Sequence, residues 1–305
     1  LLDIAFATDS TKFIEYCGAY LDAGYLNDKQ FNNYNEKFAR ALMATNKHDS
    51  AIKRLEKMKS VVDAQTINSL KAQCYAALGD YENAYKNNKF LNDQNLQNKI
   101  IAQTAHNKFE KNQFAEAAQL YSEISAGSQF TAEQIYEYCQ SLFKLNRLDA
   151  VEGLLLKLQD ISSDKNKKLL VAVINSLINS SKTKPAARLL KHFSAIAADA
   201  DSKSKINDLN TRLIKIAFDC ADYRALLKYY EDYAGRLITN AEIENSDLSR
   251  LAAVAYYKTG ALKSANGLLK NLQSDRDALV YRYDIEYTRG ATQSADSILF
   301  EIVNA

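Results

Sequence analysis

The sequence predicts an all-α protein built from antiparallel helix pairs that repeat along the chain. A turn followed by a small residue returns about every 34 residues, and the segments between the turns carry apolar residues at helical spacing. The 305 residues include 9 glycines and 1 proline, too few turn residues for an all-β protein of this length. Hydrophobic residues make up 47% and charged residues 25% of the chain, which is typical of a folded protein.

The repeating unit is a Gly or Asn, an aromatic or aliphatic residue two positions later, and a small residue three positions after that. The small residues of the first four copies lie 33, 33 and 34 positions apart. The next interval is 35 or 36, two intervals near 39 or 40 follow, and the last is 30. The clearest copies are LGDYENA (78–84), KNQFAEA (111–117), TGALKSA (259–265) and RGATQSA (289–295), with degenerate copies at 45–51 and 145–151.

Each interval has room for two helices of about 12–15 residues and two short turns. A stripe of Ala117, Leu120, Tyr121 and Ile124 has the i, i+3, i+4, i+7 spacing of one helix face. The turn Gly or Asn suits the left-handed residue that ends a helix. The small residue lets paired helices approach closely. The repeat therefore assigns structural roles to Ala51, Ala84, Ala117, Ala265, Ala295, Gly79, Gly260 and Gly290.

The elements follow in chain order from a helix at about 11–23, which carries Phe13, Tyr16, Tyr20 and Leu21 and is expected to cap the first repeat. Residues 1–29 form this capping region, and residues 30–305 form the repeat array. Asp80 and Asp149 follow turns and are expected to cap the next helix. The two long intervals place insertions at 194–207 and 235–247, either as longer loops or as extended helix ends, with a possible soft break at 195–207.

These repeats resemble the tetratricopeptide repeat (TPR). The best copy matches it at Ala72, Tyr75, Gly79, Tyr81 and Ala84, and the resemblance covers about residues 30–305. It implies a right-handed superhelical solenoid of about eight antiparallel helix pairs. The usual tryptophan of each repeat is absent, and so is the usual proline between repeats, because the one proline stands at the expected start of a second helix.

No catalytic or metal-binding constellation is present in the sequence. His48, His106 and His192 fall in different repeats, and the motifs GxSxG, HExxH and GxxxxGK[ST] are absent. The carboxylates follow helix surfaces, as at Glu133 and Glu137, and are expected to lie on solvated faces. We predict no enzyme activity, no cofactor and no metal. The four cysteines form no CxxC pair and are expected to pack between helices as small hydrophobic residues.

The resemblance also implies where a partner would bind. In tetratricopeptide repeats the first helix of each pair lines an inner groove that holds a partner segment. An aromatic groove of mixed charge suits a protein ligand. Glu36 and Leu70 stand where chaperone-binding members carry cationic or amide side chains that clamp a carboxylate, so we expect no such clamp. Carried over by position, the expected groove residues are Arg40, Gln73, His106, Phe109, Tyr136, Gln140, Phe143, Lys144, Arg250, Tyr257, Lys258 and Tyr287.

A run of basic residues from Asp164 to His192 is open to two interpretations. It contains seven lysines and arginines against one acid, although the whole chain has 39 basic and 37 acidic residues and a net charge of +2. It is either a docking patch for an acidic partner or two exposed turns of a lysine-rich protein. Aromatic residues are not interleaved with these charges, which disfavours nucleic acid.

The sequence thus predicts a non-enzymatic scaffold that binds protein partners, with no nucleic acid and no insertion into a membrane. Its composition is rich in Lys, Asn, Tyr and Ile, and is similar to that of bacterial TPR scaffolds of the flagellar motor, which implies the periplasm. The cytoplasm is the expectation otherwise. The alternatives are an accessory or regulatory domain of a larger enzyme, and a factor for envelope export or assembly.

Overall fold

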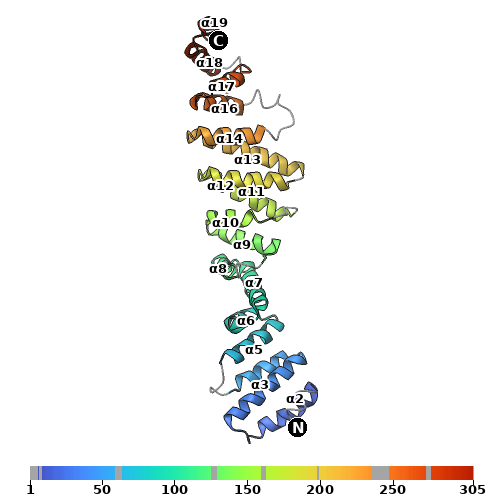
Figure 1. The fold of residues 1–305 in the computed structure, drawn as a ribbon. Helices are drawn as coiled ribbons and strands as arrows, with labels where there is room; N and C mark the ends of the chain where they lie inside the picture. Colours follow the sequence, from blue (N-terminus) through green and yellow to red (C-terminus); the bar gives the residue numbers. More distant parts are fainter. Residues whose placement is uncertain are drawn as a thin grey trace. The chain divides into compact units, whose positions relative to one another are not determined.

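The computed structural model describes residue 6 and residues 9–58, 64–124, 129–158, 163–197, 199–234, 247–272 and 276–304. These residues form helices and turns and no strand, which confirms the all-α prediction. The chain divides into two compact units, unit 1 (Leu1–Leu145) and unit 2 (Asn146–Ala305). Within each unit, successive helices pack against one another in chain order (Figure 1).

Unit 1 opens with a single helix that precedes the paired helices. Three antiparallel pairs follow, α3 with α4, α5 with α6 and α7 with α8. The unit ends with α9, the first helix of the next predicted pair. Its helices are α2 (Ser10–Asp22), α3 (Asp28–Ala44), α4 (His48–Glu56), α5 (Ala64–Ala77), α6 (Tyr81–Asn87), the 3-10 helix η1 (Asn88–Phe90), α7 (Gln94–Glu110), α8 (Phe114–Glu123) and α9 (Ala132–Lys144).

Unit 2 opens with α10 and continues with four pairs, α11 with α12, α13 with α14, α16 with α17 and α18 with α19. The two units thus contain seven of the eight predicted pairs. The boundary between the units falls between α9 and α10, the two helices of the remaining predicted pair. The helices of unit 2 are α10 (Leu148–Leu155), α11 (Asp164–Asn179), α12 (Thr183–Ile196), α13 (Ala200–Asp219), α14 (Tyr223–Ala234), α16 (Asp247–Lys258), α17 (Leu262–Leu269), α18 (Arg276–Thr288) and α19 (Thr292–Asn304).

A residue with left-handed backbone ends the first helix of each predicted pair. At Gly79 φ is 78°, and the amide of Asp80 donates to the carbonyl of Tyr75 at 2.9 Å, which closes a Schellman-type turn. Two of these residues are neither Gly nor Asn, and the sequence pattern did not mark them. The eight residues are Asn46, Gly79, Asn112, Asn146, Ser181, Ala221, Gly260 and Gly290.

The small residue after each turn lies at the contact between helices. Ala84 is fully buried and packs with Ala72, Leu91 and Ile100, so the side chain has no room to grow. The same burial holds at Ala51, Ala117, Ala265 and Ala295, and the less similar copies place Val151, Ala186 and Leu226 there.

Helix capping agrees with the sequence at one of the two expected residues. Asp80 caps α6 by accepting a hydrogen bond from the amide of Asn83 at 3.2 Å. The prediction for Asp149 was wrong, since the residue before α10 is Arg147 and its side chain makes no cap bond. Asp149 instead accepts a hydrogen bond from Lys182 Nζ at 2.8 Å, one repeat further along the chain.

The first insertion is helical. Residues 200–207 are the first turns of α13, a helix of 20 residues, so the extra length of this repeat extends a helix rather than a loop. The division between units lies at Leu145–Asn146, and α13 belongs wholly to unit 2. The second insertion, 235–247, lies outside the described residues except for its last residue, Asp247, which begins α16.

The N-terminal helix packs through one face onto the first repeat. Phe13, Cys17 and Leu21 of α2 are buried in a cluster with residues of α3, α4 and α5. The aromatic side chains of Tyr16 and Tyr20 are 56% and 41% exposed, so they take little part in this packing. The helix therefore covers the apolar side of the first repeat and leaves its tyrosines accessible to solvent.

Three of the four cysteines are buried between helices, as expected. Burial raises the pKa of Cys17 and of Cys74 to about 11, which keeps both as neutral thiols. Burial also raises the pKa of Cys139. The expectation was wrong for Cys220, which is exposed, because it follows α13 directly at a helix end rather than lying on a packed face.

Candidate functional site

Within each unit, the first helices of the pairs line a side of the unit that is hollowed. The residue six positions before each left-handed turn residue occupies an equivalent place on the first helix of its pair, which we call the register position. We call the side of these helices around that position the first-helix face. The sequence pattern located six of the eight register positions and missed two, Asn175 and Lys215, because their repeats carry Ser181 and Ala221 at the turn. The eight positions are Arg40, Gln73, His106, Gln140, Asn175, Lys215, Val254 and Asp284.

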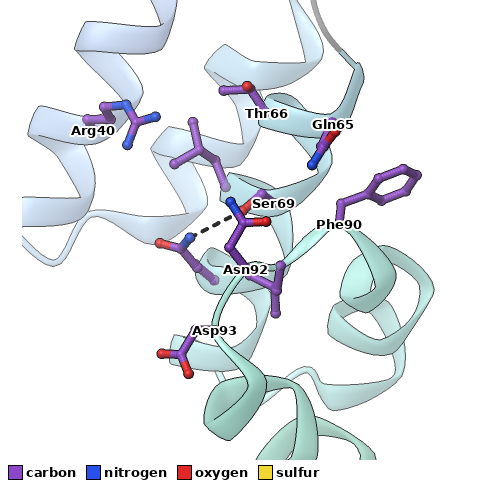
Figure 2. Close-up of a pocket in the computed structure, with 10 residues that line it drawn as sticks. Arg40, Gln65, Thr66, Ser69, Phe90, Asn92 and Asp93 are labelled. Atoms are coloured by element: carbon purple, nitrogen blue, oxygen red, sulfur yellow. Dashed lines mark hydrogen bonds between the residues drawn. The ribbon is translucent and has the colours of Figure 1, made fainter.

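A hollow of about 450 Å³ lies on this face of unit 1, where α3, α5 and the segment 90–93 meet (Figure 2). We call it the amide hollow, because uncharged hydrogen-bonding side chains, three of them amides, form half of its wall. Two predicted groove residues line it, and the segment 90–93 was missed, because it joins two pairs and carries no repeat signature. The lining residues are Arg40, Gln65, Thr66, Ser69, Leu70, Gln73, Phe90, Leu91, Asn92 and Asp93.

The walls of the amide hollow are held by local hydrogen bonds. Arg40 donates through Nε and Nη2 to Oε1 of Glu36, at 2.9 and 2.8 Å, which fixes the guanidinium one helical turn along α3. Gln97 of α7 donates from Nε2 to the carbonyl of Leu91 at 2.6 Å. Asp93 caps α7 by accepting from the amide of Asn95 at 2.9 Å. The segment 90–93 is therefore anchored to α7 and forms a fixed wall.

A second hollow of about 230 Å³ lies further along unit 1, and we call it the histidine hollow. At its floor Glu137 is 4% exposed, and its Oε1 lies 2.7 Å from Nδ1 of His106. The hydroxyl of Tyr121 donates to the same carboxylate. Burial and this hydrogen bond raise the pKa of Tyr121, which stays protonated as a donor. The other lining residues are Lys99, Ala102, Gln103, Thr131, Glu133 and Gln134.

The sequence-based expectation for Glu137 was therefore wrong. It was placed on a solvated face, but α7 and α8 cover it and supply its partners, His106 and Tyr121. A buried carboxylate needs such hydrogen bonds to offset the loss of hydration. Glu137 is best described as the group that positions the ring of His106 at the hollow.

The predicted groove aromatics of unit 1 are partly packing residues. The ring of Phe109 lies edge-on to Phe114 at 5.8 Å and to Tyr136 at 6.3 Å between centroids. All three rings are half-buried, so their outer edges remain accessible. Of the remaining predicted residues of unit 1, Gln140 and Phe143 are half-buried and Lys144 is exposed.

Of the predicted groove residues of unit 2, Tyr257 and Lys258 lie together near the end of the chain. The hydroxyl of Tyr257 donates to Asp284, and its ring lies 5.2 Å from that of Tyr281. Lys258 Nζ is 5.7 Å from the ring centroid of Tyr257. Tyr287 is 63% exposed. The remaining predicted residue, Arg250 of α16, is half-buried and takes part in an interaction with a neighbouring group.

The first-helix face of unit 2 also has a hollow, of about 360 Å³, between α11 and α13. Arg212 of α13 bridges it by donating to Asn175 and Asn179 of α11, the second at 2.7 Å. None of the groove residues predicted from the sequence lines this hollow. The register that brings Asn175 and Asn179 to this face is set by the left-handed residue Ser181, which the sequence pattern did not mark.

Neither unit presents the chemistry of a metal centre within the described part of the chain, where no group of three or more His, Cys, Asp or Glu side chains converges. No helix among the described residues is long and apolar enough to cross a membrane. The polar groups that line the hollows of the first-helix face are amides, hydroxyls and one positioned imidazole, together with charged side chains such as Arg40, Glu133 and Arg212. These groups donate and accept hydrogen bonds.

Comparisons with known proteins concern the fold alone. No family model and no curated protein matches the chain. A similar solved structure is the C-terminal part of a TPR repeat-containing protein from Cytophaga hutchinsonii, at 13% identity and a TM-score of 0.35, with 92% of this chain and 97% of that chain covered.

Two further solved structures show likenesses of the same order. A tetratricopeptide repeat protein from Parabacteroides merdae matches at 13% identity and a TM-score of 0.34, over 83% of this chain and 94% of that chain. Yeast Tom70 matches at 13% identity and a TM-score of 0.29, over 90% of this chain and 69% of its own. In its paired helices, left-handed turns and buried alanines, the chain is similar to tetratricopeptide repeat proteins.

Proposed function

We propose that the chain is a non-enzymatic scaffold whose first-helix face in unit 1 holds an extended segment of a partner protein. The observation that carries the proposal is the amide hollow, with Gln73 and Asn92 in its wall and the guanidinium of Arg40 at its edge. Amide side chains pair with the free N–H and C=O groups of an extended peptide whatever its side chains are.

The histidine hollow extends the same proposal along the face. His106 and Gln103 line it from α7, one repeat beyond the α5 residues of the amide hollow. Half-buried rings nearby, such as Phe109 and Tyr136, offer contact area at low entropic cost. A segment held across two repeats gains affinity from several modest contacts, so no single substitution is expected to abolish binding.

The proposal is tested by site-specific photo-crosslinking of the full chain in its native cell. A photoreactive phenylalanine replaces Gln73 in one variant and Gln103 in a second, and its control position is Ala115, which is exposed on α8 and lines neither hollow. We expect one partner to crosslink from positions 73 and 103 and not from 115. Equal crosslinking from position 115, or no crosslink from 73 and 103, contradicts the proposal.

The identity of the crosslinked protein addresses the cellular role. A place in a bacterial flagellar motor, and hence in the periplasm, stays a prediction from composition and depends on nothing in the two hollows. An enzyme subunit or an export component recovered at positions 73 and 103 would favour the corresponding alternative. The binding face would be the same in each case.

A further inference from the structure

The second helices of unit 2 form a basic groove on a face that the proposed function does not use. A hollow of about 600 Å³ lies between α12 and α14, and we call it the basic groove. Lys184, Arg188 and Lys191 line it from α12, at the i, i+4 and i+7 positions of one helix face. Arg224 and Lys228 line it from α14 at i and i+4.

Most of this positive charge has no carboxylate partner within the part of the chain that the structure describes. Arg188 is occupied, since its Nε and Nη2 donate to Glu152 at 2.6 and 3.0 Å. The other four cations, Lys184, Lys191, Arg224 and Lys228, make no ion pair within 4 Å to any carboxylate among the described residues. All four cations are exposed, so the groove presents them to solvent without a carboxylate partner from the described segments.

The two acids of the groove do not cancel this excess. Asp222 precedes α14 and accepts a hydrogen bond from the amide of Ala225 at 3.1 Å, so it serves as a helix cap. Asp232 is the second acid, against five basic side chains. The whole chain is nearly balanced, with 39 basic and 37 acidic residues, so the excess is local to the groove rather than a general property.

The floor of the groove is apolar and smooth. Ala187 and Ala225 line it from the two helices, and the ring of Tyr229 is buried with 6% of its surface exposed. Small residues between two basic rows let another backbone approach closely. Because Tyr229 is buried, it offers no face on which a nucleic acid base could stack.

We propose that the basic groove binds an acidic helix of a partner protein. From Lys184 to Lys191 the basic row of α12 spans about 10 Å, the same length as carboxylates at i, i+4 and i+7 on a facing helix. Such a helix would place small apolar residues on the alanine floor and its acids against the two rows of cations. Because the groove and the helix match in charge and in spacing, the affinity is expected to fall with rising salt and to depend on where the acidic residues stand along the helix.

The test uses the full chain and two synthetic acidic peptides, each of about 15 residues, near the length at which an alanine-rich helix becomes stable in water. One peptide carries glutamates at i, i+4 and i+7 on one face, and the other has the same composition with the glutamates spread around the helix. Binding is measured by fluorescence anisotropy at low and high salt. We expect the one-faced peptide to bind more tightly than its scrambled partner, and raised salt to weaken it.

The groove variant is Lys191→Glu with Arg224→Glu and Lys228→Glu, and its matched control is Lys165→Glu with Lys168→Glu, exposed lysines of the same basic run on α11. Since each exposed pair contributes modestly and reversal adds repulsion, the groove variant is expected to lose about tenfold or more in affinity and the control less than about twofold. Charge-removing variants to Gln at the same three positions, with circular dichroism melts, separate lost binding from lost folding.

Four results would overturn the proposal. They are no binding at millimolar peptide, equal affinity for the two peptides, equal loss in the control variant, and affinity unchanged by the groove variant. Tighter binding of a single-stranded oligonucleotide than of the one-faced peptide would assign the groove to nucleic acid instead. None of these results bears on crosslinking at positions 73 and 103, so the two proposals stand or fall separately.

Discussion

At the scale of single residues, the turn between paired helices carries most of what the sequence reveals. Gly and Asn tolerate left-handed backbone, so they mark six of the eight turns, as at Gly79 and Asn112. Ser181 and Ala221 adopt the same conformation, with φ near 55°, and have no such preference. Packing of the surrounding helices imposes it on them, and composition alone does not reveal it.

This difference makes a prediction about Ala221. An L-residue other than glycine in this conformation destabilises the folded state by about 1–2 kcal/mol. Glycine avoids this strain but loses more backbone entropy on folding than alanine, which costs about 0.5–1 kcal/mol. Ala221→Gly is therefore expected to raise the free energy of unfolding by about 0.5 kcal/mol. Urea denaturation followed by circular dichroism measures the change in midpoint.

The reverse substitution is the matched control. A Cβ added at Gly79 meets no atom within 4 Å, so Gly79→Ala introduces conformational strain and no clash. By the same two contributions, it is expected to lower the free energy of unfolding by about 0.5 kcal/mol. A destabilising Ala221→Gly, or a neutral Gly79→Ala, would show that the turn residue does not control the stability of the pair.

Glu137 shows the limit of sequence reasoning at the same scale. Its neighbours in sequence predict an exposed helix position, and its burial depends on Tyr121 of α8 and His106 of α7. Those contacts arise from stacking of successive repeats. The sequence therefore located the first-helix face but not which of its polar side chains are buried and which line the hollows.

At the scale of elements, the ends of α13 show how a helix is fixed in its repeat. Asp199 accepts hydrogen bonds from the amide and hydroxyl of Ser202, at 2.8 and 2.9 Å, and from Lys167 Nζ of α11 at 2.9 Å. These bonds lower the pKa of Asp199 from its ordinary value of 3.8, the bond from the Ser202 amide most of all. One carboxylate thus caps a helix and joins it to the preceding pair.

The sign of the resulting pH dependence follows from the lowered pKa. A carboxyl with a lower pKa in the folded state adds stability that is present above pH 3.8 and is lost as pH falls through the folded pKa. Asp199→Asn keeps an oxygen that can cap α13 but loses the charge that attracts Lys167. We expect this variant to be less stable than the wild type at neutral pH and the difference to shrink on acidification.

Urea midpoints of the two proteins at neutral pH and near pH 2 measure that difference. Asp199→Ala serves as the control, because it loses the cap as well and should remain the least stable of the three at neutral pH. A wild-type advantage over Asp199→Asn that stays constant or grows on acidification would exclude the lowered pKa of Asp199 as its source.

At the scale of the whole molecule, the contacts within each unit join a helix mainly to the next helix and to the corresponding helix of the adjoining pair. This pattern is typical of repeat proteins, in which stability is a sum of repeat and nearest-neighbour contributions. The regular repeats at Ala84 and Ala117 were located from the sequence because the fold needs a small residue there. The division at Leu145 was not, because it reflects the number of contacts between repeats and not their composition.

Ala84→Leu tests how far a local defect extends. Ala84 is fully buried against Ala72, Leu91 and Ile100, so added methylenes are expected to wedge the helices apart at a cost of about 1–3 kcal/mol. Hydrogen exchange measured by mass spectrometry should show lost protection in residues 64–110 and unchanged protection in residues 247–304. Ala115→Leu, on the exposed side of α8, is the control and should change neither region.

Two results would contradict this nearest-neighbour account. Equal loss of protection in residues 247–304 would mean that the chain unfolds as one cooperative unit despite its local contacts. Unchanged protection in residues 64–110 would mean that the contact at Ala84 can absorb a larger side chain, and the alanine of the repeat would then need another explanation. Protection lost around α5, α6 and α7 alone places the energetic role of Ala84 in its own and adjoining pairs, as expected where each repeat is held by its neighbours.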